Sequence, residues 1–157
     1  MDSSLCLALA IDQFGAENVL SMSFSYGQRH TKELTMAQTI CKEWNVDNTV
    51  INLDCLNEIT ESALFVSTAE IKHRKGEAPN TIVVGRNGLM ARIAAIHADH
   101  IGADQIFMGV IEVEAANSGY RDCTRKYMDI IQAGLRVDLD NMQFEIKNQL
   151  VSMAKKL

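Results

Sequence analysis

Short apolar segments alternate with longer amphipathic segments along this chain, and this alternation limits the possible folds more than any other feature. Apolar side chains at three- and four-residue spacing predict helices, whereas short apolar runs bounded by turn residues predict strands. The predicted strands cover residues 19–24, 49–53 and 105–110, and a final extended segment covers residues 144–150. The predicted helices cover residues 2–14, 30–44, 87–102 and 123–137. Strands separated by helices of this length indicate βαβ units, and therefore a parallel sheet with helices on both faces. Right-handed crossovers then give a Rossmann-like, doubly wound α/β fold.

The smaller features fit between these elements. Gly15 is expected to end the first helix as a left-handed C-cap. A helical turn is expected near residues 56–59, and residues 65–80 are polar and irregular. A short apolar stretch covers residues 81–84, and residues 152–156 resemble the first turn of another helix.

The length and composition indicate one soluble domain. A chain of 157 residues is long enough to bury roughly 70% of its unfolded surface in a single core. Its hydrophobic content of 47% and charged content of 22% are ordinary for globular proteins. No apolar run approaches the ~20 residues of a membrane helix, and the first fifteen residues lack the basic start of a signal peptide. We therefore expect a cytoplasmic protein with no second domain.

Charge and cysteine spacing weigh against two classes of function. The net charge of −5 argues against a nucleic-acid partner, because such domains are usually basic. The four cysteines, Cys6, Cys41, Cys55 and Cys123, are scattered singly, which argues against a zinc ribbon within this chain. His97 and His100 have a metal-compatible spacing, but no third ligand is evident, so no metal site is predicted.

Polar loops follow the predicted strands, and in parallel sheets ligands bind at the carboxyl ends of strands. One loop, Met1-Asp2-Ser3-Ser4, lies at the start of the first helix. The others read Ser25-Tyr26-Gly27-Gln28-Arg29-His30, Pro79-Asn80-Thr81 with Gly85-Arg86-Asn87, and Asn117-Ser118-Gly119-Tyr120 with Asp122-Cys123. We expect these loops to lie along one edge of the sheet.

Taken in this order and spacing, the motifs YGQRH, PNT, GRN and SGY followed by DC resemble the 7-cyano-7-deazaguanine synthases, the QueC family of the queuosine pathway. The likeness spans about residues 1–153. It implies a PP-loop ATP pyrophosphatase with an adenine nucleotide alpha hydrolase-like fold. It also implies a ligase that uses ATP, Mg²⁺ and ammonia to convert 7-carboxy-7-deazaguanine to 7-cyano-7-deazaguanine (preQ0) through an adenylated carboxylate.

The resemblance assigns roles to individual residues. Arg86 would meet a carboxylate or phosphate as a planar fork, and Asp122 would accept hydrogen bonds from the guanine-like edge; these two are the predicted catalytic residues. Residues predicted to bind ATP are Asp2, Ser3, Ser4, Leu5, Tyr26, Gln28 and Arg29. Residues predicted to border the substrate are Gly85, Asn87, Ser118, Gly119 and Tyr120.

Simpler interpretations stay open for several of these residues. Asp2 and Ser3 could form a plain helix cap, Arg29 could be a surface residue, and Arg86 could belong to an ordinary salt bridge. Asp122 could merely cap the helix from residue 123 onward. Cys123 is interpreted as a packing residue, because the implied mechanism needs no cysteine nucleophile.

The chain departs from the family pattern in several places. The family's phosphate loop reads Ser-Gly-Gly-x-Asp-Ser, and only Met1-Asp2-Ser3 corresponds to it here. The first strand, the Ser-Gly-Gly turn and the C-terminal segment with four zinc-binding cysteines are expected to be missing. Residues 148–150 read Asn-Gln-Leu instead of Thr-Pro-Leu, and Arg121 stands where a proline is common. We therefore expect an incomplete piece of the enzyme. A missing strand would expose apolar surface and favour a homodimer.

Other functions remain alternatives. Another PP-loop ATP-dependent ligase is one, although tRNA thiolases should be basic and carry paired cysteines. A nucleotide-binding module without catalysis is a second, although its glycine-rich loop is not evident. A purely structural fragment is the third.

Overall fold

The computed structural model describes residues 2–26, 31–60, 83–110 and 120–148 of the 157-residue chain. The chain divides into two compact units. The N-terminal unit comprises Leu7–Val83, and the C-terminal unit comprises Val84–Leu157 together with Met1–Cys6. The single-domain organisation expected from the sequence stays a prediction.

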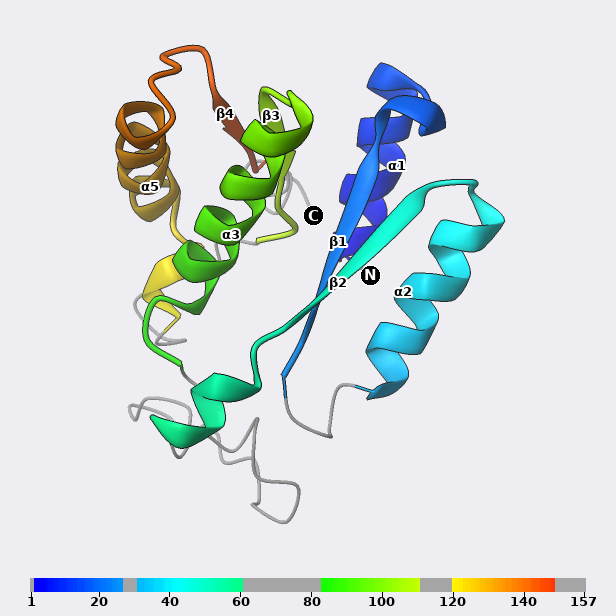
Figure 1. Ribbon diagram of the computed structural model, residues 1–157, viewed down its shortest axis with the longest axis horizontal. Coiled ribbons are helices and arrows are strands. Elements are labelled where there is room, and N and C mark those ends of the chain that lie inside the picture. Colours follow the sequence, from blue (N-terminus) through cyan, green and yellow to red (C-terminus); the bar gives the residue numbers. More distant parts are fainter. Residues whose placement is uncertain (1, 27–30, 61–82, 111–119, 149–157) are drawn as a thin grey trace, which may run out of the picture. The chain divides into compact units, whose positions relative to one another are not determined.

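A parallel strand pair and its connecting helix form the centre of the N-terminal unit (Figure 1). The elements are α1 (Asp2–Phe14, which begins in the other unit), η1 (Ala16–Asn18), β1 (Leu20–Ser25), α2 (Thr31–Glu43), β2 (Asp47–Asn52) and η3 (Asp54–Glu58). Strands β1 and β2 pair in parallel register from Leu20 opposite Asp47 to Ser25 opposite Asn52. Because α2 joins these strands and contacts both of them, β1, α2 and β2 make a βαβ unit.

The C-terminal unit has a second parallel pair with two helices packed against it (Figure 1). Its elements are α3 (Arg86–Ile101), β3 (Gln105–Phe107), η4 (Arg121–Cys123), α5 (Arg125–Asp138) and β4 (Glu145–Lys147). The residue pairs in register are Gln105 with Glu145, Ile106 with Ile146, and Phe107 with Lys147. The core consists of Ala91, Ala95, Ala98, Val110, Met128, Leu135, Phe144 and Ile146. The three alanines lie four and three residues apart on α3, so they share the face of the helix that enters this core.

Side chains of α5 close the edge of β4 that faces away from β3. Gln132 Oε1 accepts a hydrogen bond from the Ile146 N–H at 2.7 Å. Arg136 Nε donates to the Phe144 carbonyl at 2.8 Å. The alternate backbone groups of β4 point toward β3, as in the hydrogen bond from the Met108 N–H to the Lys147 carbonyl at 3.0 Å. The two α5 side chains therefore take the place of a neighbouring strand.

Three helices end in the same way, with one residue in the left-handed conformation. Asn45 (φ 55°), Gly102 (φ 74°) and Asp140 (φ 48°) occupy that position after α2, α3 and α5. The next residue in each case donates its N–H five residues back, to the carbonyls of Cys41, Ala98 and Arg136 respectively. This hydrogen bond is the signature of a Schellman motif, which satisfies carbonyls that the helix leaves unpaired.

Gly15 corrects one expectation at the end of α1. Its φ of 81° is positive, but its ψ of 149° lies outside the left-handed helical region that was predicted. That combination is accessible essentially only to glycine. Gly15 thus turns the chain directly into η1 rather than closing α1 with a left-handed cap.

The structure confirms the α/β class and the parallel pairing, and the strand expected over residues 105–110 is shorter than predicted. The four long helices and the turn near residue 56 occur within a few residues of their predicted bounds. The strand expected over residues 105–110 forms a ladder only at Gln105–Phe107, because it pairs there with β4, and β4 lies within the extended segment expected over 144–150. Residues 149–150 of that segment lie outside the described residues. The described strands form two separate pairs, so one doubly wound sheet stays a prediction. The expectations for residues 65–80, 81–82 and 152–156 lie outside the described residues.

Within the part of the chain that the structure describes, every helix is too short or too polar to cross a membrane.

Candidate functional site

The GRN segment begins helix α3, and a glycine starts it. Gly85 is the N-cap residue and has a left-handed conformation with φ 67° and ψ 19°. Its carbonyl accepts the first intrahelical hydrogen bond, from the Leu89 N–H at 3.0 Å. A glycine has no side chain with which to bind the other free N–H groups of the first turn. Another element must therefore supply the cap.

Asp122 supplies that cap from η4. Its Oδ2 accepts a hydrogen bond from the backbone N–H of Asn87 at 3.0 Å. The Asn87 side chain strengthens the same connection, since its Nδ2 donates to Cys123 Sγ at 3.3 Å. A carboxylate at this position is also favoured by the positive end of the helix dipole. The GRN and DC segments, which the sequence analysis singled out separately, are thus hydrogen-bonded to each other.

This arrangement corrects the simpler interpretation of Asp122. Asp122 was considered as a cap for the helix beginning near residue 123, but Thr124 caps that helix. Thr124 Oγ1 accepts a hydrogen bond from the Tyr127 N–H at 3.2 Å in the first turn of α5. The carboxylate of Asp122 caps α3 instead, because η4 brings it to the first turn of that helix.

The half-buried Cys123 thiol remains protonated at neutral pH. Burial raises the pKa of Cys123 above its ordinary value, and the Asp122 carboxylate raises it further. The Arg86 guanidinium and the hydrogen bond from Asn87 oppose this shift without reversing it. A protonated thiol is a weak nucleophile. Cys123 therefore acts here as a packing residue that accepts a hydrogen bond from Asn87 Nδ2 and donates one to Asp122 Oδ1 at 3.9 Å.

Tyr127 is a residue of this site that the sequence analysis missed. Its hydroxyl lies against α3 at Gly88, so close that a Cβ atom there would overlap it, and 3.3 Å from where a Cβ at Gly85 would be. Burial raises the pKa of the Tyr127 phenol, and the Asp122 carboxylate raises it further. The sequence signal was the second glycine of Gly85-Arg86-Asn87-Gly88, since a glycine inside a helix often marks a close approach.

The predicted ATP-binding residues fall in both units. Ser3, Ser4 and Leu5 lie in the first turn of α1, where Ser3 and Leu5 are exposed and Ser4 is half-buried. Asp2 begins the helix. Tyr26 directly follows β1 in the N-terminal unit and is half-buried. Gln28 and Arg29 lie outside the described residues.

The predicted substrate-binding residues are only partly described. Gly85 and Asn87 form the start of α3, as set out above. Tyr120 precedes η4, and its carbonyl accepts a hydrogen bond from the Cys123 N–H at 3.2 Å. Ser118 and Gly119 lie outside the described residues. Among the described residues, the site is thus built from α3, η4 and the first turn of α5.

The first turn of α1 fits a phosphate group in its chemistry. The first N–H groups of a helix have no intrahelical partner and point out of its N-terminus, where a phosphate oxygen can accept from them. The exposed Ser3 hydroxyl adds a further donor. These residues are compatible with the phosphate loop that the sequence analysis assigned to them.

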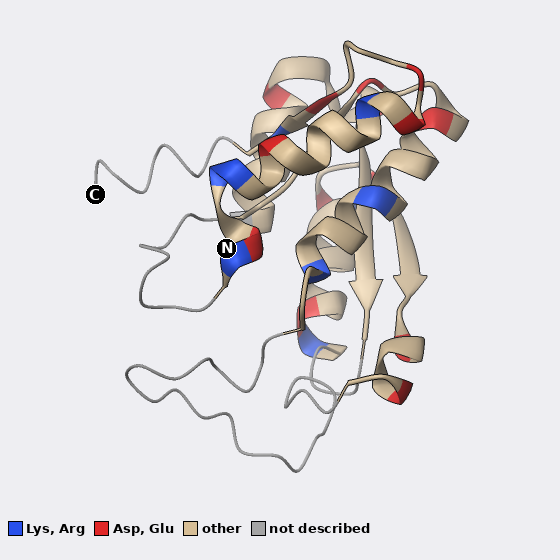
Figure 2. Ribbon diagram, turned by 90° about the vertical axis from the view of Figure 1, so that its left-hand side faces the viewer, with Lys and Arg blue, Asp and Glu red and all other residues tan. Residues whose placement is uncertain are grey.

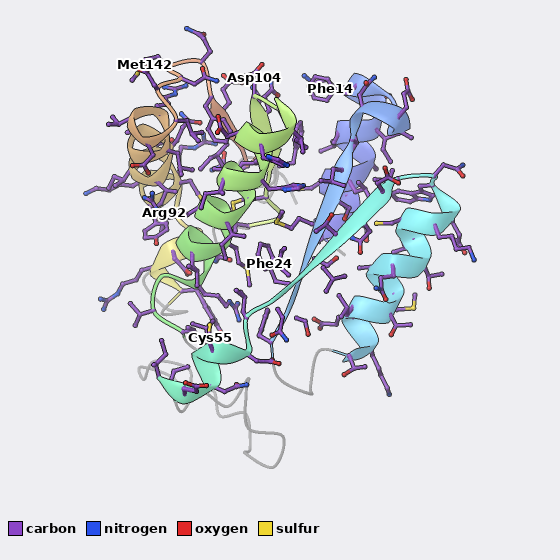
Figure 3. The ribbon with its side chains drawn as sticks, in the orientation of Figure 1. Phe14, Phe24, Cys55, Arg92, Asp104 and Met142 are labelled. Carbon is purple, nitrogen blue, oxygen red and sulfur yellow. The ribbon has the colours of Figure 1, made fainter. Side chains whose placement is uncertain are left out.

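Metal ligands do not gather in the described ranges. No group of three or more histidine, cysteine or acidic side chains is placed to hold a metal ion there. All four cysteines are free thiols, Cys6 and Cys41 buried and Cys55 exposed in η3 (Figure 3). The His97 and His100 rings lie 6.2 Å apart on α3. These residues do not make a zinc site.

Charged residues are interspersed along the ribbon (Figure 2). In the C-terminal unit the described basic residues are spread over α3, η4, α5 and β4. Two of them pair with nearby carboxylates, Arg92 with Asp138 and Lys147 with Glu145. The Glu145 pKa is lowered mainly by its hydrogen bond from Lys147.

The chain matches a known protein family. The family described as "Queuosine biosynthesis protein QueC" matches residues 1–157, which is the whole of this chain. The match includes the segments that meet at the start of α3. The chain belongs to the QueC family of queuosine biosynthesis proteins.

Proposed function

We propose that this protein catalyses the ATP-dependent conversion of 7-carboxy-7-deazaguanine and ammonia to 7-cyano-7-deazaguanine. The observation that carries the proposal is the family match over residues 1–157. The meeting of the GRN and DC segments at one helix start supports it, because it gathers an arginine and a carboxylate next to the polar start of α3. The fold we propose for the whole chain is one doubly wound sheet, in a cytoplasmic homodimeric enzyme.

The chemistry explains why such a site needs both charges. A carboxylate is a poor electrophile because oxide is a very poor leaving group. ATP, when bound, supplies an adenylyl group that makes one carboxylate oxygen a good leaving group. Ammonia then gives the amide, and a second activation of the amide oxygen gives the nitrile. Each activation releases pyrophosphate, so cationic groups that stabilise negative charge lower the barrier.

Arg86 is the residue we assign to the substrate carboxylate or to phosphate. It is the first residue of α3, next to the Gly85 N-cap, and its guanidinium is near enough to Cys123 to influence that thiol. A guanidinium can donate two parallel hydrogen bonds to a carboxylate or phosphate. Arg86 would hold the reacting group at the helix start and neutralise its charge.

Asp122 is the residue we assign to the heterocycle. Its Oδ2 accepts a hydrogen bond from the Asn87 N–H and its Oδ1 accepts one from the Cys123 thiol at 3.9 Å, and each carboxylate oxygen has a further lone pair for another donor. The N1–H and amino group of a guanine-like edge are two donors that a carboxylate can accept. Asp122 would therefore both cap α3 and orient the base beside Arg86.

The ATP phosphates are assigned to the first turn of α1. Ser3 and Ser4 would donate hydroxyl hydrogen bonds beside the N–H groups of the helix start. Mg²⁺ would accompany the phosphates, with Asp2 as the nearest candidate carboxylate. Tyr26, Gln28 and Arg29 are proposed for the adenosine, and Ser118, Gly119 and Tyr120 for the border of the base.

The test is a direct assay of nitrile formation from the purified protein, the carboxylate, ATP-Mg²⁺ and ammonia, read by mass spectrometry. Arg86→Ala should lower kcat/KM about 100-fold, and Asp122→Ala about tenfold or more. The matched control is Arg92→Ala on the same helix, whose side chain is exposed and paired with Asp138 (Figure 3). We expect kcat/KM to stay within about twofold of wild type in this control.

Two outcomes would contradict the proposal. Wild-type rates in Arg86→Ala and Asp122→Ala would remove these residues from the site. Adenylation of other carboxylates, with 7-carboxy-7-deazaguanine left unchanged, would instead indicate another PP-loop ligase.

A further inference from the structure

We propose that Tyr127 is a positioning residue for Arg86, acting through a notch that Gly88 leaves in the first turn of α3. This inference rests on the proposed function only for its kinetic readout. The notch is defined here as the surface of α3 over Gly85 and Gly88 that the Tyr127 phenol covers. The three residues belong to the C-terminal unit.

The notch exists because two glycines flank Arg86 and Asn87. A Cβ atom at Gly88 would overlap the Tyr127 hydroxyl, and it would lie 3.1 Å from Cζ and 3.2 Å from Ile131 Cδ1. Gly88 is also buried. A side chain at residue 88 would therefore have to push α3 and α5 apart or displace the phenol. The first turn of α3 can approach α5 this closely only with glycine at that position.

The first turn of α5, which carries Tyr127, is fixed by hydrogen bonds and by the core. The Tyr127 N–H is bonded to Thr124 Oγ1, and the Met128 N–H is bonded to the Thr124 carbonyl at 3.1 Å. Met128 itself is 1% exposed and belongs to the core. The start of α5 is thus fixed by its cap and by the core, and this fixes the backbone from which the Tyr127 side chain reaches α3.

Asp122 and Tyr127 hold the same helical turn through different atoms. Asp122 binds the N–H of Asn87, whereas the Tyr127 hydroxyl packs against α3 at Gly88 and lies 3.3 Å from where a Cβ at Gly85 would be. Arg86 lies between these contacts in sequence, so both of them restrain the backbone on either side of it. The helical turn that carries Arg86 is therefore held by both η4 and α5.

The Tyr127 hydroxyl contributes to this arrangement by its size. Among residues whose placement is described, it has no hydrogen-bond partner. Removing the hydroxyl therefore costs no bond and leaves room in the notch. The contact can therefore be tested with two compensating substitutions, one that adds a methyl group at residue 88 and one that removes the oxygen at residue 127.

The experiment compares Gly88→Ala, Tyr127→Phe and the double variant. Gly88→Ala should lower kcat/KM for the carboxylate about tenfold or more. The change should fall in the same constant, kcat or KM, that Arg86→Ala alters. Tyr127→Phe should lower kcat/KM by less than Gly88→Ala does, because loss of the hydroxyl loosens the first turn of α3 without displacing it. The double variant should recover most of the loss, because the atom that the new methyl would overlap is gone. If Tyr127→Phe does not restore kcat/KM in Gly88→Ala, the proposal that the Tyr127 hydroxyl fills the notch is wrong.

The route through Arg86 is tested in the Arg86→Ala background. There, Gly88→Ala should lower kcat/KM no further, because the group that it misplaces is already gone. Effects that multiply would show that Gly88 and Tyr127 act independently of Arg86, and would overturn the proposal.

A readout without substrate separates this inference from the proposed function. The Nε–Hε signal of Arg86, assigned by its loss in Arg86→Ala, should shift in the NMR spectrum of Gly88→Ala and return in the double variant. If wild type forms no nitrile, the proposed function is wrong, but this measurement still tests whether Tyr127 and Gly88 position Arg86. An unchanged Arg86 signal in folded Gly88→Ala would overturn the positioning role.

Discussion

The carboxylate of Asp122 accepts a hydrogen bond from the backbone N–H of Asn87 at 3.0 Å, so a residue of η4 caps a helix that begins far earlier in the chain. Gly85, which starts α3, has no side chain for this purpose. The cap and the candidate site are thus the same contact. Substitutions at Asp122 should change both stability and activity.

The first prediction concerns the stability of Asp122 variants. Asp122→Ala should lower the free energy of unfolding by about 1 kcal/mol, as for other lost helix caps. Asp122→Asn keeps an acceptor oxygen but loses the charge, so its free energy of unfolding should fall by less than that of Asp122→Ala. Urea unfolding of the three proteins measures both differences.

Asp129→Ala is the matched control for this series. Asp129 is an exposed acidic residue on α5. Its replacement should change the free energy of unfolding by less than about 0.5 kcal/mol. An equal loss in Asp129→Ala and Asp122→Ala would show that the Asn87 contact contributes nothing specific.

The second prediction is an order of thiol reactivity. Cys55 is exposed, Cys123 is half-buried, and Cys6 and Cys41 are buried. In native protein treated with iodoacetamide, Cys55 should be alkylated first, followed by Cys123, with the other two slowest. Because burial and the Asp122 carboxylate raise the pKa of Cys123, its alkylation rate should continue to rise at a pH above the ordinary thiol range. Peptide mass spectrometry over a pH series measures both rates.

Asp122→Asn tests the electrostatic part of this prediction. Removal of the neighbouring carboxylate takes away one cause of the raised pKa, so Cys123 should react faster than in wild type at the same pH. Cys55 serves as the internal reference. An unchanged ratio of the two rates would mean that burial alone controls the thiol.

The fold was predictable where one local pattern decides an element. The amphipathic spacing of α2 and the apolar run of β1 gave both elements within about a residue or two of their observed bounds. The parallel pairing followed from the alternation of helices and strands. The shorter ladder of β3 was not predictable, because ladder length depends on the partner strand and not on the apolar run alone.

The site was predictable only as a set of segments. The GRN and DC segments were singled out from the sequence, but the bond between Asp122 and Asn87 depends on how η4 meets α3. Tyr127 was missed because its role comes from a contact with Gly88 on another helix, and no periodicity reports such a contact. The left-handed Asn45 and Asp140 were missed for a related reason, since only glycine gives a clear signal for that conformation.

The third prediction concerns the closed edge of β4. Gln132 Oε1 accepts from the Ile146 N–H in a half-buried position, so Gln132→Met should leave that N–H without a partner. The expected loss is about 1–3 kcal/mol in the free energy of unfolding. Gln132→Glu keeps an acceptor of the same shape and is the matched variant. Its free energy of unfolding should fall by less than that of Gln132→Met. Equal stability of Gln132→Met and wild type in urea unfolding would contradict the role of this hydrogen bond.

The fourth prediction concerns the left-handed residues that end the helices. Asn45 is exposed with φ 55°, a conformation that glycine adopts without a Cβ penalty. Asn45→Gly should therefore raise the free energy of unfolding by up to about 1 kcal/mol. Gly102→Ala is the reciprocal change: a Cβ there would meet nothing within 4 Å, so the cost comes from the φ of 74° alone. It should lower the free energy of unfolding by about 1 kcal/mol, as measured by urea unfolding of each variant. A stabilised Gly102→Ala would show that the end of α3 rearranges instead of keeping its left-handed residue.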